Sequence, residues 1–155
     1  MTMHQIPRPC VCTSVRRTAR VLARTYDALL SNSGMNVTQL AVMRAIIRHP
    51  KEPVSHVAED LEMERTSLYR ALATLQRKRW VDLEDGTDGR SQSVSITQIG
   101  YVALAKADPY WVNIQTAIVR RFGYARWTEF AIELQRLADC ANSVATSQSH
   151  RRAGS

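Results

Sequence analysis

Two groups of residues in this sequence have side chains that could do chemistry. Near the start, Cys10-Val11-Cys12 places two thiols one residue apart, ahead of a predicted helix. A thiolate at a helix N-terminus has a lowered pKa and is oxidised selectively, so these two thiols are candidates for redox chemistry. Farther along, the segment from Arg65 to Arg79 holds five basic residues and no acidic one, which would attract an anionic partner. The five are Arg65, Arg70, Arg77, Lys78 and Arg79.

The basic residues lie in a segment that reads as two short helices joined by a turn. In the first, the apolar residues from Val54 to Leu61 follow the i, i+3, i+4, i+7 spacing of one buried face. Pro53 fixes where this helix begins, and Ser55 is expected to cap it. The second helix has an apolar stripe, and its opposite face is free to enter a groove of DNA. The stripe consists of Leu68, Ala71, Leu72 and Leu75.

A β-hairpin is predicted after the second helix. Two strand-like runs, Trp80 to Asp85 and Ser91 to Ile96, flank a turn rich in glycine and aspartate. We interpret Trp80 as a core residue at the base of this wing and not as a platform for base stacking. Arg90 near the tip could enter a narrow minor groove, whose negative potential attracts arginine. Two helices followed by a hairpin describe a winged helix-turn-helix, a DNA reader.

The second helix supplies most of the predicted DNA contacts. Arginine can donate two hydrogen bonds to guanine, and threonine can contact a thymine methyl group or a base acceptor. Base-edge contacts are expected from Thr66, Tyr69 and Arg70. Phosphate contacts are expected from Arg65, Ser67 and Thr74. Two alternatives stay open: Tyr69 could be partly buried in the core, and the cations Arg77, Lys78 and Arg79 could cap the helix and offset its dipole instead of binding phosphate.

The chain resembles the MarR family of bacterial transcriptional regulators. The resemblance rests on the run from ERTSLYRAL through LQRKRWV, on the wing pattern Asp88-x-Arg90, and on SITQIGYVAL after the wing. The last run contains the family pattern Leu/Ile-Thr-x-x-Gly, here Ile96, Thr97 and Gly100. The resemblance implies that Asp88 orients Arg90 for contact with DNA.

One departure from the family pattern concerns the wing. Family members often carry a second basic residue just after the wing arginine, whereas Ser91 and Gln92 follow it here. We therefore expect the wing to bind DNA more weakly than is usual for the family.

The resemblance also implies a dimer and an effector. In the family the terminal helices form a dimer interface, so the homodimer reads a pseudo-palindromic operator in double-stranded DNA with half-sites about one helical turn apart. Many members release DNA when a small aromatic or phenolic acid binds between these helices and the winged lobe, and a subgroup senses peroxides through a cysteine near this place. The effector or redox candidates in this chain are Cys10, Cys12, Arg16, Tyr26 and Trp111.

Each of these candidates also has a plainer interpretation. Aromatic residues at helical spacing more often belong to a core, a run of charges is usually a solvated helix face, and a free cysteine is often a small apolar filler. A zinc site needs four ligands, and Cys10, Cys12 and His4 supply at most three, with His49 and His56 on separate elements. We expect no metal site and no cofactor.

Apolar spacing predicts further helices on both sides of the winged region. Steps of three and four residues from Val15 to Leu29 and from Phe130 to Val144 are typical of helices packed on helices. These two helices could pack inside a monomer, but a homodimer interface is the favoured interpretation. A helix from Thr38 to Arg48 is expected to be largely buried at Leu40, Met43, Ala45, Ile46 and Ile47, and a long helix from Thr97 to Phe122 is expected to kink or break at Pro109.

The predicted fold is mainly α with a small β-hairpin wing: a winged helix-turn-helix domain plus N- and C-terminal dimerisation helices. Residues 1–12 would form a flexible N-terminal arm with Cys-x-Cys, and residues 147–155 a disordered tail. Residues 13–33 and 98–146 would form the helical dimerisation region, and residues 37–97 the DNA-binding domain.

Composition narrows the class of protein. A chain of 155 residues fits one domain with a real core, and a net charge of +7 favours an anionic partner. The opening MTMHQIPRP has no apolar core, and no run approaches the ~20 apolar residues of a membrane helix, so we expect a cytoplasmic protein that does not contact membranes. An odd number of cysteines, three, then indicates reduced thiols.

The sequence therefore predicts a sequence-specific DNA-binding transcriptional regulator, a homodimeric repressor released by a small molecule or an oxidant. It contains no Gly-rich phosphate loop, no His-Glu-x-x-His and no nucleophile elbow, so no enzyme activity is expected. The alternative is a winged-helix module that binds a protein partner and little DNA, which a flat response of DNA affinity to salt would indicate.

Overall fold

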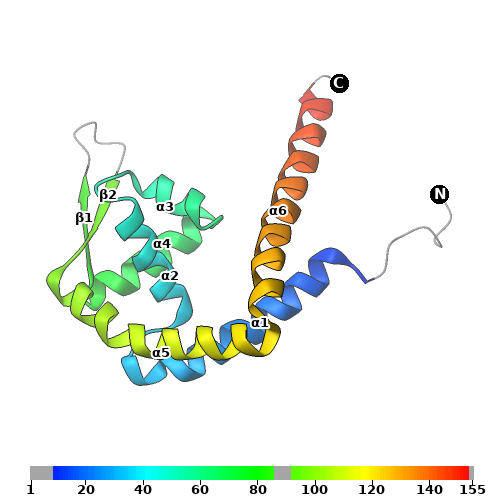
Figure 1. The fold of residues 1–155 in the computed structure, drawn as a ribbon. Helices are drawn as coiled ribbons and strands as arrows, with labels where there is room; N and C mark the ends of the chain where they lie inside the picture. Colours follow the sequence, from blue (N-terminus) through cyan, green and yellow to red (C-terminus); the bar gives the residue numbers. More distant parts are fainter. Residues whose placement is uncertain (1–8, 86–91, 154–155) are drawn as a thin grey trace. The chain divides into compact units, whose positions relative to one another are not determined.

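The computed structural model describes residues 9–85 and 92–153 (Figure 1). Its elements follow the order α1 (Val11–Leu30), η2 (Ser31–Ser33), α2 (Val37–Arg48), α3 (Val54–Asp60), α4 (Arg65–Arg77), β1 (Val81–Asp85), β2 (Gln92–Ile96), α5 (Gln98–Phe122) and α6 (Tyr124–Ala153). A mainly helical chain with one antiparallel hairpin confirms the predicted fold class. No helix among the described residues is both long enough and apolar enough to cross a membrane.

The chain divides into two compact units, Met1–Ile114 and Gln115–Ser155. The first contains α1 to β2 and the larger part of α5, and the second contains the end of α5 and all of α6. Each unit is described by itself below.

The core of the first unit lies where α2, α3 and α4 pack beside the hairpin. The predicted stripe of α4 is confirmed at Leu68, Leu72 and Leu75, which are fully buried, whereas Ala71 is only half-buried. From α2, the core receives Leu40, Val42, Met43, Ala45 and Ile46. Ile47 does not join them: it is 43% exposed, since one more residue along the helix turns its side chain about 100° away from the buried face.

Helix starts follow local hydrogen bonding. α2 begins with a capping box, in which the Asn36 side chain accepts from the Gln39 N–H and the Gln39 side chain accepts from the Asn36 N–H. α3 begins directly after Pro53, as predicted, but without a side-chain cap. The expected cap by Ser55 is wrong, because Ser55 lies inside the helix and the cap position is taken by proline.

The wing consists of β1 and β2, paired antiparallel with Val81 opposite Ile96 and Asp85 opposite Gln92. Both strands lie within one residue of the predicted runs, and Val81 and Val94 face the core. An isolated bridge joins Pro53 to Ser93, so the start of α3 is attached to the wing.

The junction between α4, the wing and α5 explains the Thr-x-x-Gly pattern. The Thr97 hydroxyl donates to the Arg79 carbonyl at 2.6 Å and accepts from the Gly100 N–H at 3.0 Å, so one side chain caps α5 and fastens it to the end of α4. A side chain at Gly100 has no room, because a Cβ there would stand 2.1 Å from the Trp80 carbonyl oxygen. The pattern is thus a packing requirement.

Three predicted boundaries need correction. α5 continues through Pro109 without a break; Ala107 and Ile114, buried on either side of the proline, hold both halves of the helix. α1 begins at Val11, so Cys12 lies in its first turn and not in an arm over residues 1–12. α6 extends to Ala153, beyond the predicted start of a disordered tail at residue 147.

Candidate nucleic-acid interface

The surface of α4 opposite the buried stripe is the central feature of the candidate interface. Its first two turns expose five predicted DNA contacts: Arg65, Thr66, Ser67, Tyr69 and Arg70. Leu68, in the middle of this run, is fully buried and anchors the helix. Tyr69 is 37% exposed, which places its ring at the rim of the core and leaves part of it open to solvent. One helix therefore presents hydroxyl, phenol and guanidinium groups on a rigid support.

The start of α4 also carries acidic groups. Glu64 occupies the N-cap position without a side-chain hydrogen bond to the helix. An open depression of about 400 Å³ beside it is lined by Glu59, Glu62, Glu64 and Arg65 together with Ser55, Ala58 and Met63. The charge at this end of the helix is therefore mixed, which the run of basic residues alone did not indicate.

Thr74 and Arg77 are bonded to each other along α4. The Thr74 hydroxyl donates to the Arg70 carbonyl at 3.1 Å and accepts from Arg77 Nη2 at 3.2 Å. Thr74 is half-buried and Arg77 is exposed. Of these two predicted contacts, Arg77 has the freer side chain.

The cations at the end of α4 differ in their surroundings. The helix ends in a Schellman motif, with the Trp80 N–H donating to the Leu75 carbonyl at 3.0 Å and the Arg79 N–H to the Gln76 carbonyl at 2.8 Å. Arg79 takes the left-handed position of this motif, with a φ of 59°. Lys78 instead points back into the protein: its Nζ donates to the Gly34 carbonyl at 2.7 Å.

Trp80 stands at the base of the wing, as predicted, but it is half-buried and does not belong to the core. The Lys78 Nζ lies 4.3 Å from the centre of its ring. A cation from the chain itself therefore occupies a face that a stacking base would need.

The predicted wing contacts, Asp88 and Arg90, lie outside the described residues. At the described neck of the wing, Gln92 Nε2 donates to Asp85 Oδ1 at 2.8 Å. Gln92, the second residue after Arg90, thus joins the two strands at the neck of the wing.

The two thiols near the N-terminus are both exposed, and Cys10 occupies the N-cap position of α1. The Thr13 backbone N–H, followed by the Thr13 hydroxyl, lowers the pKa of the Cys10 thiol, although no hydrogen bond of ordinary capping geometry joins the thiol to the helix. Arg16, one turn farther on, is exposed. The start of α1 therefore favours the thiolate of Cys10.

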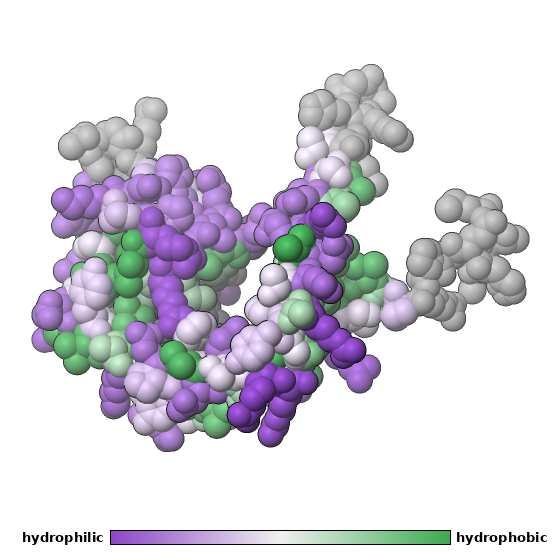
Figure 2. Space-filling model, in the orientation of Figure 1, coloured by the Kyte–Doolittle hydropathy of each residue, from purple (hydrophilic) through white to green (hydrophobic). Residues whose placement is uncertain are grey.

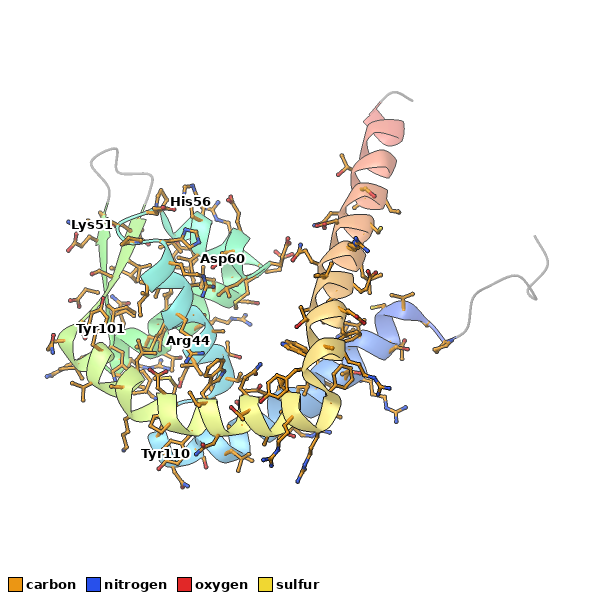
Figure 3. All side chains as sticks on the ribbon, viewed as in Figure 1. Arg44, Lys51, His56, Asp60, Tyr101 and Tyr110 are labelled. Carbon is orange, nitrogen blue, oxygen red and sulfur yellow. The ribbon has the colours of Figure 1, made fainter. Side chains whose placement is uncertain are left out.

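The aromatic effector candidates come from two different helices. Tyr26 on α1 is half-buried, and burial raises the pKa of its phenol. Trp111 on α5 is also half-buried, with the guanidinium of Arg44 lying 3.9 Å from the centre of its ring. Arg44 also pairs with Asp108 at 2.7 Å, so it fastens α2 to α5 (Figure 3).

A polar cluster at the junction of α2 and α3 was not predicted. His49 Nδ1 and His56 Nδ1 both contact Glu52 Oε2, at 3.0 and 2.7 Å. Asp60 on α3 accepts from Arg48 at 2.6 Å and lies 3.4 Å from His49 Nε2 (Figure 3). The spacing His-x-x-Glu-x-x-x-His was visible in the sequence, but Pro53 interrupts it, so no single helix predicted the contact. Within the described ranges, no group of three or more potential ligands has the arrangement of a metal site.

Apolar residues of the terminal helices are exposed. The predicted seam of α1 leaves Val15, Leu22 and Leu29 exposed by 41%, 39% and 51%. On α6, Phe130, Leu137 and Val144 are exposed by 42%, 37% and 58%, and apolar side chains reach the surface among hydrophilic ones along this helix (Figure 2). Each unit thus exposes several apolar side chains at helical spacing along one helix.

Comparison with known proteins identifies the family. Residues 33–91 match the family model described as MarR family. No curated protein matches the chain. The transcriptional regulator MosR of M. tuberculosis, solved in complex with DNA, is 30% identical, with a TM-score of 0.80 over 86% of this chain and 97% of that one.

Two more distant structures share the fold. PcaV of Streptomyces coelicolor, solved with its natural ligand, is 18% identical, with a TM-score of 0.72 over 88% of this chain and 99% of that one. MepR of S. aureus, solved with DNA, is 11% identical, with a TM-score of 0.71 over 85% of this chain and 96% of that one. The family match, the identity to MosR and the winged helix-turn-helix together lead to one conclusion: the chain belongs to the MarR family of transcriptional regulators.

Proposed function

We propose that this MarR-family regulator binds double-stranded DNA as a homodimer, reads a pseudo-palindromic operator and represses transcription until an oxidant releases it. The observation that carries the proposal is the exposed face of α4, where Thr66, Tyr69 and Arg70 stand on a helix anchored by Leu68 and Leu72. Because the backbone of α4 is already ordered, placing these residues in the major groove does not require the helix to be ordered first, which would cost binding free energy.

The homodimer is supported by the exposed apolar seams of α1 and α6. Covering such side chains gains roughly 25 cal/mol for each Å² removed from water, and a second copy of the chain brings the same seams. Two copies joined in this way would present two α4 helices. Half-sites about one helical turn apart, near 34 Å, would then suit both.

Release by an oxidant is supported by the placement of the thiols at the start of α1. The Cys10 thiolate attacks one oxygen of hydrogen peroxide and the O–O bond breaks; the hydroxide that departs takes up a proton and leaves as water, and Cys10 becomes a sulfenic acid. The Cys12 sulfur then attacks Cys10 Sγ, a second water leaves, and a disulfide remains, so two thiols have given two electrons to the peroxide.

This disulfide requires movement of the backbone. Cys10 lies at the N-cap with an extended backbone (ψ 125°) and Cys12 lies in the first turn of α1, whereas a disulfide needs Cβ atoms roughly 4 Å apart. Closing the bond between Cys10 and Cys12 would therefore unwind the first turn of α1, which alters the helix that carries the proposed dimer seam. Arg16, one turn on, would favour the attacking thiolate.

A small aromatic or phenolic acid is the second effector class that we propose. Half-buried Tyr26 and Trp111 are the aromatic residues concerned, and PcaV was solved with a natural ligand. The contact of Arg44 with the Trp111 ring makes this class the less favoured, since a ligand that stacks on Trp111 must displace the guanidinium. We also propose that the protein acts by binding and not by catalysis.

The test is a gel shift with the DNA that flanks the protein's own gene, before and after addition of hydrogen peroxide. Peroxide should release DNA from the wild-type protein and from a Cys140→Ser control, in which an exposed thiol on α6 is removed. A Cys10→Ser, Cys12→Ser double variant should stay bound. Equal release from all three would reject Cys10 and Cys12 as the sensing thiols, and release only by aromatic acids would favour the second class. A wild-type protein that shifts no duplex would favour a protein-binding module.

A further inference from the structure

The end of α4 is fastened to the short loop between η2 and α2. Lys78 Nζ donates to the Gly34 carbonyl at 2.7 Å and to Gln39 Oε1 at 3.4 Å. The same ammonium lies 4.3 Å from the centre of the Trp80 ring. An ammonium has three donors, so two of them and the aromatic contact are committed inside the protein.

The same loop is held from the other side by α1. Asp27 Oδ1 accepts from the Val37 N–H at 2.7 Å, at the first residue of α2. The capping box of Asn36 and Gln39 fixes the residues between, and Gly34 has a φ of 77° that favours glycine. Residues 34–37 are therefore clamped between a carboxylate from α1 and an ammonium from α4.

The Lys78 contacts differ from those of a phosphate-binding lysine. A lysine that binds DNA phosphate keeps its ammonium in solvent until the complex forms, whereas this ammonium already has a carbonyl, an amide oxygen and a ring as partners. Gln39 is 7% exposed, so the site lies at the edge of the core. Moving Lys78 to a phosphate would leave the Gly34 carbonyl without this donor.

From this arrangement we propose that Lys78 is a positioning residue of the DNA-binding helix. Through residues 34–37, it sets the orientation of α4 relative to α1, so that a movement of α1 reaches the reading face of α4. The inference rests on the proposed function, since it concerns how that DNA-binding face is held. It assigns a structural route between the helix that carries Cys10 and the helix that carries Arg70.

One consequence separates this role from a direct DNA contact. Asp27 and Lys78 act on the same four residues, so changes at the two positions should not add in their effects on DNA affinity. Independent sites would give additive changes in log Kd. The slope of log Kd against log salt should stay unchanged, because no phosphate contact is lost.

The experiment is a double-mutant cycle with Asp27→Ala, Lys78→Met and the pair together, with Kd for the operator measured by fluorescence anisotropy at several salt concentrations. Methionine keeps an apolar stem beside Trp80 and removes the donor. Each single variant should bind roughly three- to tenfold more weakly, and the double variant should lose less than the product of the two. Lys106→Met, which removes the same charge from an exposed position on α5, should bind like wild type.

Other results overturn the proposal. Lys78→Met could reduce the salt slope by about one, which would make Lys78 a phosphate contact. An unchanged DNA affinity of Lys78→Met with a lower melting temperature would show that Lys78 contributes only to stability. Additive losses of DNA affinity in the double-mutant cycle would show that Asp27 and Lys78 do not act through residues 34–37. If Lys78→Met does not unfold cooperatively, Lys78→Gln replaces it in the cycle and its results are interpreted in the same way. Lys78→Arg, which keeps a charged donor, should bind the operator like wild type. A wild-type protein that binds no duplex overturns the proposed function instead.

Discussion

The guanidinium of Arg44 lies 3.9 Å from the centre of the Trp111 ring. Arg44 comes from α2, in the middle of the winged region, and Trp111 from α5. The same arginine pairs with Asp108, one turn before Trp111, at 2.7 Å. A single side chain thus fastens the winged region to the long helix by a cation–π contact and an ion pair.

Removing this fastening should lower stability. Arg44→Ala is expected to reduce the free energy of unfolding by about 1 kcal/mol, because both contacts are partly exposed and therefore screened by solvent. Asp108→Asn removes only the charge of the ion pair and should cost less. Urea denaturation followed by circular dichroism checks both. Equal losses for the two variants would mean that the contact with Trp111 contributes nothing.

Gly100→Ala should be among the most damaging single changes. Its Cβ would meet the Trp80 backbone carbonyl at 2.1 Å, and backbone on both sides must shift to relieve the overlap. We expect a loss of about 3 kcal/mol, at the high end of overpacking effects. Thermal unfolding measures it.

The matched control for that change is Gly34→Ala, where no atom lies within 4 Å of the new Cβ and only the left-handed φ of 77° is unfavourable. It should cost about 1 kcal/mol. A Gly100→Ala variant no less stable than Gly34→Ala would show that the α5 junction is not closely packed.

Arg70 and Arg90 should affect DNA binding in different ways. Arg70 lies on the exposed face of α4, and Arg70→Ala should weaken operator binding by roughly 1–3 kcal/mol and relax the preference at one base pair. Arg90→Ala should weaken binding to all sequences and reduce the salt slope. Binding to operator variants and to unrelated DNA distinguishes the two. If both variants kept the footprint and the DNA affinity of wild type, the proposed contacts of α4 and the wing with DNA would be wrong.

The Glu52 carboxylate predicts how stability depends on pH. Hydrogen bonds from His56 and then His49 lower the pKa of Glu52 below its usual 4.5. A carboxyl whose pKa is lower in the folded state binds protons more readily when unfolded, so its contribution is fully present above pH 4.5 and is lost as pH falls through the folded value. The melting temperature of wild type should therefore fall on acidification below roughly pH 5 more than that of Glu52→Gln.

Glu84→Gln, an exposed change on β1, serves as the control for Glu52 and should follow wild type. If all three proteins lose the same number of degrees between pH 6 and roughly pH 3, the contacts with the histidines do not govern the acid response.

Local periodicity predicted the winged region well. Spacings of three and four residues placed α2, α3 and α4, and alternation about a Gly- and Asp-rich turn placed β1 and β2, because each pattern reflects burial of one face. The prediction failed where tertiary packing outweighed a local sequence preference. Pro109 has its neighbours Ala107 and Ile114 buried, which sustains a helix that proline alone would interrupt.

The faces of α4 were predictable, but the partners of its cations were not. Helical spacing put Arg70 on the exposed side, whereas nothing local distinguishes Lys78 from Arg77 or Arg79. The Lys78 contact with Gly34 joins residues far apart in the sequence, as does that of Arg44 with Asp108. Such long-range polar contacts have no periodic signal, so the structure was needed to find them.

The central claim is that the exposed face of α4, presented twice by a dimer, binds duplex DNA. Its most direct test is the Kd of the wild-type protein for its operator, measured by fluorescence anisotropy across salt concentrations from 50 to roughly 300 mM. Contacts with at least four phosphates predict that log Kd rises with log salt with a slope of roughly 3.6 or steeper, with two chains bound to each duplex. A slope near zero, or one chain on each duplex at saturation, would contradict the claim.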